Sequence, residues 1–199
     1  MLTRRTLLLS TVLTGVLLAA PRAWAQSTAD ATAFINRLGA SMLAVVNGPG
    51  TAAEKKKKLA PIIEAAVDVD GIARFSLGRF WRTATPEQQV TYSRLFHDVL
   101  LNNIGGKIGE FQGVTYTMTS TTQKEGDIAV GMIITRPNQA PNNVQWVVNA
   151  VGGSWKVVDV IAEGTSLRLT QRQDYAAYLT RNGNNVDALI TAMKQQLQG

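Results

Sequence analysis

Apolar side chains change their spacing twice along this chain, and no other feature constrains its fold as strongly. Between about residues 30 and 104 they recur at helical spacing, between 114 and 161 they alternate with polar or small residues, and between 167 and 197 helical spacing returns. Alternation in short runs separated by turn residues is typical of an antiparallel meander. Because helices and strands are segregated along the chain, we predict an α+β fold, with a curved antiparallel sheet of about four strands packed against several helices.

The last predicted strand, residues 155–161, follows the pair Gly152 and Gly153. Two adjacent glycines adopt the positive φ angles of a tight hairpin turn without steric cost. Both faces of this strand are largely apolar, which indicates that both faces are covered. After the strand, Thr165 or Ser166 is placed to cap the helix that follows.

Asp159 is an acidic residue within this apolar strand, and strict alternation places it on the same face as Trp155 and Val157. A buried carboxylate requires a partner. The following helix carries two arginines within reach, Arg168 and Arg172. We predict that Asp159 forms a structural ion pair, assigned to Arg172, and does not act as a catalytic acid.

Short capping motifs mark the starts of the helices. Residues 85–88, Thr-Pro-Glu-Gln, combine a cap, a proline at the first helical position and a reciprocal glutamine. They predict a long helix that ends near Ile104 and faces the sheet. Thr51 begins a second capping box, whose helix contains Pro61 and is expected to kink or split there. Asp70 is expected to cap a short third helix.

The first 25 residues have the pattern of a cleavable export signal. Arg4 and Arg5 precede an apolar run, and the small residues of Ala23-Trp24-Ala25 mark a cleavage site before Gln26. The arginine pair fits either a twin-arginine signal or an ordinary secretory signal. We therefore predict a signal peptide over 1–25, a single domain over 26–199 and a periplasmic location.

Removal of the signal would change the charge of the chain. The whole sequence has a formal net charge of +6. The signal segment holds three arginines and no acidic residue, so the mature chain would carry +3. This small excess and the predicted compartment argue against nucleic-acid binding. The run 55–58 consists of four lysines, which fit either a solvated helix end or contact with an acidic membrane surface or partner.

The sequence offers little catalytic chemistry. Cysteine is absent, which excludes disulfides, thiolate nucleophiles and thiolate metal ligands. The single histidine is His97, and Ser166 lies in a Gly-Thr-Ser-Leu-Arg run without the spacing of a nucleophile elbow. We predict a protein that is not an enzyme and uses no metal or cofactor. A periplasmic hydrolase that uses His97 and Ser166 is the minor alternative.

Two long motifs are similar to those of one family. Residues 153–167, Gly-Ser-Trp-Lys-Val-Val-Asp-Val-Ile-Ala-Glu-Gly-Thr-Ser-Leu, followed by Arg172 and Tyr175, resemble the closing motif of the MlaC-type, toluene-tolerance auxiliary proteins. Residues 72–82 together with 85–89 resemble the first signature of that family. The similarity covers nearly all of the mature chain in order. A hopanoid-associated branch of the same superfamily has similar length and signals and is the alternative.

The resemblance implies a periplasmic carrier that holds phospholipid acyl chains in an apolar pocket between sheet and helices. It also implies exchange with an inner-membrane ABC transporter complex and an outer-membrane lipoprotein complex, with transient contact at the membrane surface. The residues alone fit either a filled core or a sheet curved away from its helices around a cavity. If there is such a pocket, its predicted lining is Phe75, Phe80, Trp81, Phe96, Val99, Leu100, Ile104, Val130, Met132, Ile134, Trp146 and Val148.

Overall fold

The computed structural model describes residues 20–198, so most of the predicted signal peptide lies outside the described residues. The first helix, α1 (Ala20–Asn47), begins before the predicted domain start at Gln26. The remaining helical elements before the sheet are α2 (Ala52–Ala66), α3 (Val69–Leu77), η1 (Gly78–Arg82), α4 (Pro86–Gly106) and η2 (Ile108–Phe111). The strands are β1 (Thr115–Lys124), β2 (Asp127–Thr135), β3 (Asn142–Val151), β4 (Ser154–Ala162) and β5 (Thr165–Ser166), and the chain continues into α5 (Leu167–Arg181) and α6 (Val186–Gln196).

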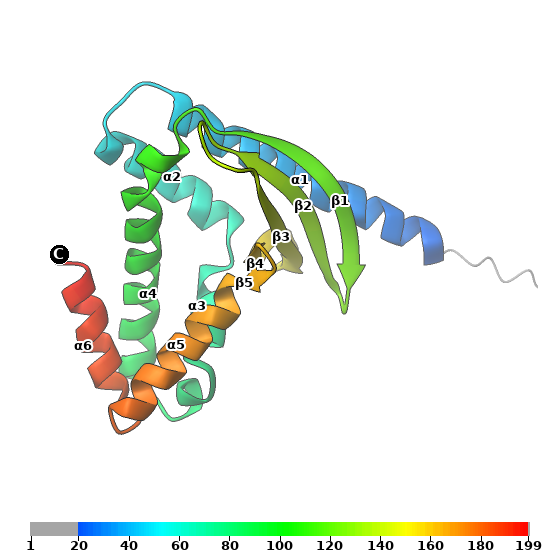
Figure 1. The fold of residues 1–199 in the computed structure, drawn as a ribbon. Coiled ribbons are helices and arrows are strands. Elements are labelled where there is room, and N and C mark those ends of the chain that lie inside the picture. The colour runs from blue at the N-terminus through cyan, green and yellow to red at the C-terminus, as the bar shows by residue number, and fades with distance from the viewer. Residues whose placement is uncertain (1–19, 199) are drawn as a thin grey trace, which may run out of the picture.

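The predicted α+β class is confirmed, with one short strand more than expected. The strands pair in the order β1-β2-β3-β4-β5, and each pair is antiparallel. Figure 1 shows the sheet as a curved meander with the helices before and after it in the chain. Gly152 and Gly153 have φ angles of 58° and 79°, as the predicted tight turn between β3 and β4 requires.

The helix starts follow the capping signals with one exception. The amide of Thr85 donates to the Gln88 side chain at 2.9 Å, and the amide of Gln88 donates to the Thr85 hydroxyl at 3.2 Å, which completes the predicted capping box of α4. The predicted cap of α3 is wrong, because Asp68 and not Asp70 is the N-cap and accepts the amide of Gly71, the third residue of that helix. Helix α2 is continuous through Pro61, so the predicted split does not occur.

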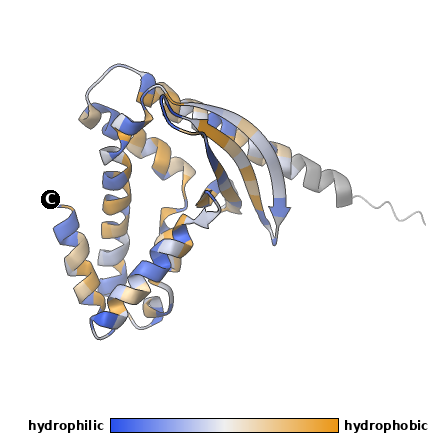
Figure 2. Cartoon of the chain, viewed as in Figure 1, coloured by the Kyte–Doolittle hydropathy of each residue, from blue (hydrophilic) through white to orange (hydrophobic). Residues whose placement is uncertain are grey.

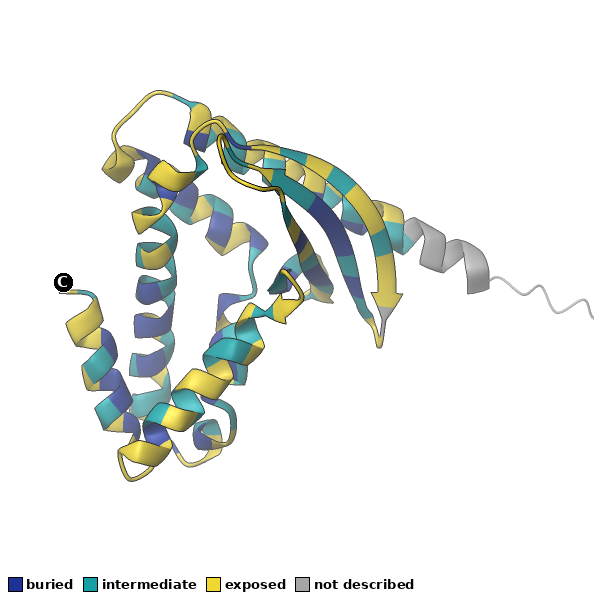
Figure 3. Ribbon diagram, viewed as in Figure 1, coloured by how far each residue is buried: buried dark blue, intermediate teal, exposed yellow. Residues whose placement is uncertain are grey.

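One face of the sheet packs against α1, which runs along it in Figure 1. Pairing places Ile128 opposite Val148 and Val130 opposite Trp146, so the alternating apolar residues of β2 and β3 share that face. Figures 2 and 3 show β2 as more apolar and more buried than the edge strand β1. The buried residues of this group, the sheet cluster, are Ala31, Ile35, Leu38, Ala66, Ile128, Val130, Met132, Val148 and Val157.

The long helix α4 belongs to a separate helical half. It contacts α2, α3 and α6, whereas the apolar face of the sheet is covered by α1, so the prediction that the long helix faces the sheet is wrong. The buried residues around α4, the helical cluster, are Val69, Ala73, Leu77, Phe80, Ala84, Tyr92, Leu95, Phe96, Val99, Leu179, Val186, Leu189, Ile190 and Met193. A small third group, the α2 cluster, consists of Val46, Leu59, Ile63 and Ile108.

A β-bulge in β4 determines which face Asp159 occupies. Val157 pairs with Val148 and Asp159 pairs with Val147, which leaves Val158 as an extra residue. Because consecutive residues of β3 point to opposite faces, their partners Val157 and Asp159 also lie on opposite faces. Val157 belongs to the sheet cluster. The prediction that Asp159 shares the face of Val157 is therefore wrong, and Asp159 lies on the face away from α1.

Candidate functional site

The residues predicted to line a pocket are divided among the three clusters. Those in or against the helical cluster are Phe80, Trp81, Phe96, Val99 and Leu100. Those in or against the sheet cluster are Val130, Met132, Ile134, Trp146 and Val148. Ile104 packs against the α2 cluster, and Phe75 contacts two arginines of α5. The structure does not gather these residues around one space, and their contact with a ligand stays a prediction.

Aromatic rings fill the interior of the helical cluster. Tyr92, which the sequence pattern did not single out, is fully buried, and its ring centroid lies 6.0 to 6.4 Å from those of Trp81, Phe96 and Tyr175. Its hydroxyl donates to a backbone carbonyl of α3 at 2.9 Å. Burial raises the pKa of Tyr92, and burial together with the nearby Asp174 raises the pKa of Tyr175 to about 12. The position of Tyr92 four residues before Phe96 on one helix is the signal that could have identified it.

The three clusters meet at Val67, in the short connection between α2 and α3. Among the described residues, Val67 is the one that packs against all three clusters. Beside it is a hollow of about 300 Å³, whose lining comes from the end of α2, the start of α3, the middle of α4 and β4. We call this the junction hollow; its lining residues are Glu64, Val67, Asp68, Val69, Asp70, His97 and Lys156.

A histidine and a lysine, His97 and Lys156, both line the junction hollow. Nε2 of His97 lies 3.2 Å from a carboxylate oxygen of Glu64, and Nδ1 lies 3.6 Å from a carboxylate oxygen of Asp98. Nζ of Lys156 donates to the backbone carbonyl oxygens of Ala65 and Glu64 at 2.5 and 3.5 Å, at the carboxyl end of α2. The lysine thereby supplies a positive charge where the helix dipole favours one.

Two further carboxylates belong to the start of α3. Asp68 uses one carboxylate oxygen to accept the amide of Gly71 at 3.1 Å. A β-carbon at Gly71 would collide with that carboxylate, so the cap depends on glycine at this position. The side chain of Asp70 is exposed and has no hydrogen-bond or ion-pair partner within the described part of the chain. The junction hollow therefore contains both signs of charge, with carboxylates in the majority.

A second hollow, of about 400 Å³, lies between α5 and α6 and is lined in part by Tyr175, Tyr178, Arg181 and Met193. Neither this hollow nor the junction hollow lies between the sheet and α4, where the sequence-based alternative placed an apolar cavity. The junction hollow is the one at which the two halves of the molecule meet.

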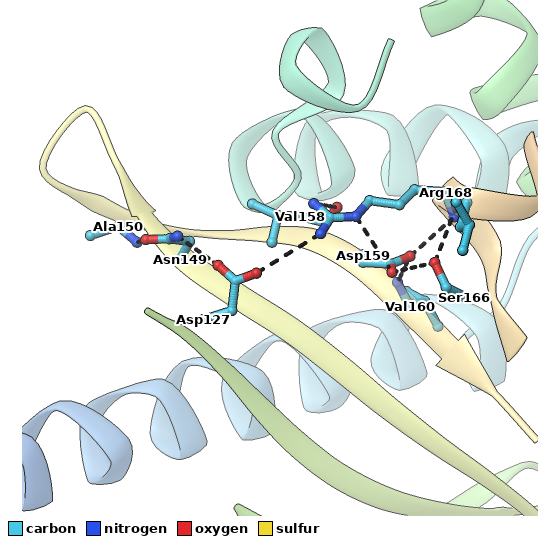
Figure 4. A network of polar contacts seen from close by, with 9 residues as sticks. Asp127, Asn149, Ala150, Val158, Asp159, Val160, Ser166 and Arg168 are labelled. Carbon is cyan, nitrogen blue, oxygen red and sulfur yellow. Dashed lines mark hydrogen bonds and ion pairs between the residues drawn. The ribbon is translucent and has the colours of Figure 1, made fainter. Parts of the chain in front are cut away.

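Asp159 anchors the start of α5 through a buried polar network (Figure 4). Its carboxylate accepts the Ser166 hydroxyl at 2.6 Å, the Val160 amide at 2.8 Å and the Arg168 amide at 3.1 Å. Nε of Arg168 lies 3.5 Å from the same carboxylate, and its guanidinium also lies 3.9 Å from Asp127. Asp159 therefore has an ion-pair partner on α5, which is Arg168.

The partner assigned to Asp159 is corrected by the structure. Arg168, and not Arg172, pairs with the carboxylate. The guanidinium of Arg172 instead lies over the ring of Phe75, 4.9 Å from its centroid, and Arg168 lies 4.8 Å from the same centroid. Phe75 thus contacts both arginines by cation–π interactions. The bonds that Asp159 accepts from Ser166 and from the Arg168 amide hold its carboxylate at the first turn of α5, beside the Arg168 side chain.

The residues of the hydrolase alternative have separate partners. His97 pairs with Glu64 on α2, while Ser166 donates to Asp159 and accepts the Leu169 amide as the cap of α5.

One lysine of the run 55–58 contributes to the fold, because Nζ of Lys55 donates to the Val46 carbonyl at 2.7 Å. Lys57 and Lys58 remain exposed.

Within residues 20–198 no helix is long and apolar enough to cross a membrane. The same residues contain no group of three or more acidic or histidine side chains arranged to hold a metal ion.

Comparisons with known proteins find one matching family, one relative by sequence and one protein of similar fold. The family described as MlaC protein matches residues 37–195. The toluene tolerance protein Ttg2D of Pseudomonas putida is 33% identical over 131 residues, which cover 65% of this chain and 61% of that protein. A phospholipid-binding protein from Ralstonia solanacearum, solved in complex with a phospholipid, has a similar fold, with a TM-score of 0.75 and 22% identity over 84% of this chain and 97% of that one. With a family match over most of its length, this chain belongs to the MlaC family.

Proposed function

We propose that this protein binds phospholipid and carries it through the periplasm. Its membership of the MlaC family supports the proposal, as does its likeness to the Ralstonia solanacearum protein that was solved with a phospholipid bound. The observation on which the proposal rests within this chain is the junction hollow, where separate apolar clusters meet beside charged side chains.

Such a carrier answers a physical need. Each methylene exposed to water costs about 0.8 kcal/mol, so two acyl chains with roughly thirty methylenes would cost on the order of 20 kcal/mol in bare transit. A charged headgroup has the opposite preference and must remain solvated or paired. A protein that carries phospholipid therefore requires an apolar interior for the chains and a polar opening for the headgroup.

The junction hollow suits the headgroup more than the chains. Drug-sized ligands occupy pockets of roughly 300 to 1,000 Å³. The hollow, at about 300 Å³, is at the small end of that range and is too small for two acyl chains. At about 300 Å³ the hollow accommodates a headgroup. We infer that the acyl chains enter along the line where the sheet cluster and the helical cluster meet at Val67, and that the two halves separate to admit them.

The finer features of the proposal follow the family resemblance. An export signal over residues 1–25 would deliver the chain to the periplasm. There it would exchange phospholipid with an inner-membrane ABC transporter complex and an outer-membrane lipoprotein complex. No catalytic residue is assigned, since transfer of an intact lipid breaks no bond. Hopanoid lipids are the alternative cargo.

Lipid analysis of the purified protein tests the proposal. The mature chain should release about one phospholipid per protein on solvent extraction, measured by mass spectrometry, and should take up phospholipid from vesicles. Val67→Trp fills the junction of the clusters and should reduce uptake several-fold. The matched variant Val90→Trp alters a side chain that is 71% exposed on α4 and should leave uptake unchanged. Absence of bound lipid together with no uptake by the unaltered protein would overturn the proposal.

A further inference from the structure

We propose that the first turn of α5, together with the adjoining end of α3 and η1, forms a surface that docks the protein onto an anionic lipid membrane. This inference rests on the proposed function, because a phospholipid carrier has to reach a membrane, and it adds the surface that makes the contact. It follows from arginines that have no acidic partner and from leucines that are exposed beside them. We call this surface the docking patch; its members are Phe75, Arg79, Leu167, Arg168, Leu169 and Arg172.

The arginines of the docking patch are held on aromatic rings. Arg168 and Arg172 are one helical turn apart on α5, and their guanidiniums lie 4.8 and 4.9 Å from the ring centroid of Phe75 on α3. A β-carbon at Gly78, the first residue of η1, would lie 3.2 Å from Nε of Arg172, so this side chain also lies against the backbone that leads to Arg79. The guanidinium of Arg79 lies 4.8 Å from the ring centroid of the residue that follows it. The arginines therefore come from neighbouring segments at the place where α5 packs against α3 (Figure 1).

Two of these arginines have unused donors. Arg168 is paired with Asp127 and Asp159. Arg79 and Arg172 are exposed, and neither makes a hydrogen bond or an ion pair with any residue in the described part of the chain. A guanidinium that lies over a ring keeps the N–H donors at its edge, and its planar fork matches the oxygens of a phosphate. Arg79 and Arg172 therefore present oriented donors to an anion outside the protein.

Exposed leucines accompany the arginines. Leu167 is 51% exposed and Leu169 is 45% exposed, and both belong to the first turn of α5. Leu169 is three residues before Arg172, which places the two side chains next to each other on the helix surface. The members of the docking patch line neither of the two hollows, so the patch offers neither hollow to an inserted side chain of a protein partner. Cations with leucines between them suit the headgroup region of an anionic bilayer, where phosphates attract the cations and apolar side chains insert.

Binding to vesicles tests the proposal. Flotation should compare the mature protein on vesicles of phosphatidylcholine alone with the same protein on vesicles of equal parts phosphatidylcholine and phosphatidylglycerol. The protein should bind the anionic vesicles only, and added salt should release it, because salt screens exposed charges. One arginine near such a surface strengthens binding about fivefold, so Arg172→Gln and Arg79→Gln should each weaken binding by about that factor. Leu169→Gln should weaken it several-fold without any change in net charge.

The matched control is Arg37→Gln, which removes the same charge from an exposed residue of α1, the helix on the sheet. It should leave vesicle binding as it is. Thermal melts of these variants should stay close to that of the unaltered protein, because none of the replaced side chains makes a hydrogen bond or an ion pair with a described residue.

Three results would each overturn the membrane assignment: equal binding to both kinds of vesicle, unchanged binding in Arg172→Gln, or an equal loss in Arg37→Gln. Binding of an acidic protein but of neither vesicle would also overturn it, and would assign the docking patch to a protein partner. Mass spectrometry of the lipid that co-purifies with the protein keeps the two proposals apart. Failure to dock by a protein that still holds phospholipid would remove this inference alone, whereas a protein that neither holds nor takes up phospholipid would remove the proposed function.

Discussion

Removal of the Asp159 carboxylate should destabilise the fold by about 3 kcal/mol. The side chain is 5% exposed and accepts hydrogen bonds from Ser166 and from the backbone amide of Arg168. Loss of one partner of a buried ion pair costs roughly 3 to 5 kcal/mol, because the other charge remains without compensation. The low end applies here, since Arg168 is 29% exposed and retains its contacts with Asp127 and Phe75.

Asp159→Ala should therefore lower the thermal midpoint by roughly 6 to 12 °C in a domain of this size. Asp159→Asn is the matched control, because it keeps an oxygen acceptor and removes the charge, and it should cost less. Urea unfolding of Asp159→Ala, of Arg168→Met and of the double variant measures the coupling directly, and the two single losses should not add. A loss below about 1 kcal/mol in Asp159→Ala would show that the network does not anchor α5, and the reasoning would be refuted.

Two further perturbations test other parts of the fold. The pKa of Tyr175 is raised to about 12, whereas an unfolded tyrosine titrates near 10, so the unfolded chain loses this proton first as the pH rises. The free energy of unfolding should therefore fall between pH 10 and 12 by up to about 2 to 3 kcal/mol. In urea unfolding, Tyr175→Phe should lack this part of the fall. A β-carbon at Gly39 would lie 3.0 Å from the Tyr116 ring, whose hydroxyl bonds to Asn36 on α1. Gly39→Ala should therefore reduce the free energy of unfolding by roughly 1 to 2 kcal/mol through overpacking, whereas Gly106→Ala, with open space around it, should reduce it by almost nothing. Equal losses in the two variants would contradict the contact between α1 and Tyr116 of β1.

Local signals in the sequence predicted local structure well. The capping box at Thr85 and the hairpin at Gly152 and Gly153 depend on a few neighbouring residues, and both form as expected. The cap of α3 shows the limit of such signals. Asp68 and Asp70 are both suitable caps, and the choice between them depends on where α2 ends and on the absence of a side chain at Gly71.

The bulge explains the larger errors around Asp159. Strict alternation assigns faces correctly as long as each residue has one partner, and a single extra residue reverses every assignment after it. Nothing in the run of valines near Val158 signals that extra residue. The ion-pair partner was assigned wrongly for a different reason: Asp159 also binds the Ser166 hydroxyl and the Arg168 amide, which places it at the first turn of α5, before Arg172.

The spacing of apolar residues within a strand shows that the strand has an apolar face, but it does not show which helix packs on that face. Val130 and Met132 were expected to face the long helix, and they pack beneath α1. Helices α1 and α4 both carry an apolar stripe, and tertiary packing decides which of them meets the sheet. Sequence periodicity therefore identified the members of the clusters but not their division into separate groups.

That division gives the connection between α2 and α3 its importance. The amide of Asp68 donates to the Val157 carbonyl at 2.9 Å, and Val67 forms a parallel bridge with Val157. Together with the bonds from Lys156 to the end of α2, these contacts join β4 to the connection where the clusters meet. Because each half has its own packed cluster, a separation of the halves would disturb the contacts at this seam and leave both clusters intact. The proposed entry of acyl chains at Val67 would therefore require a local opening of this seam and no unfolding of either half.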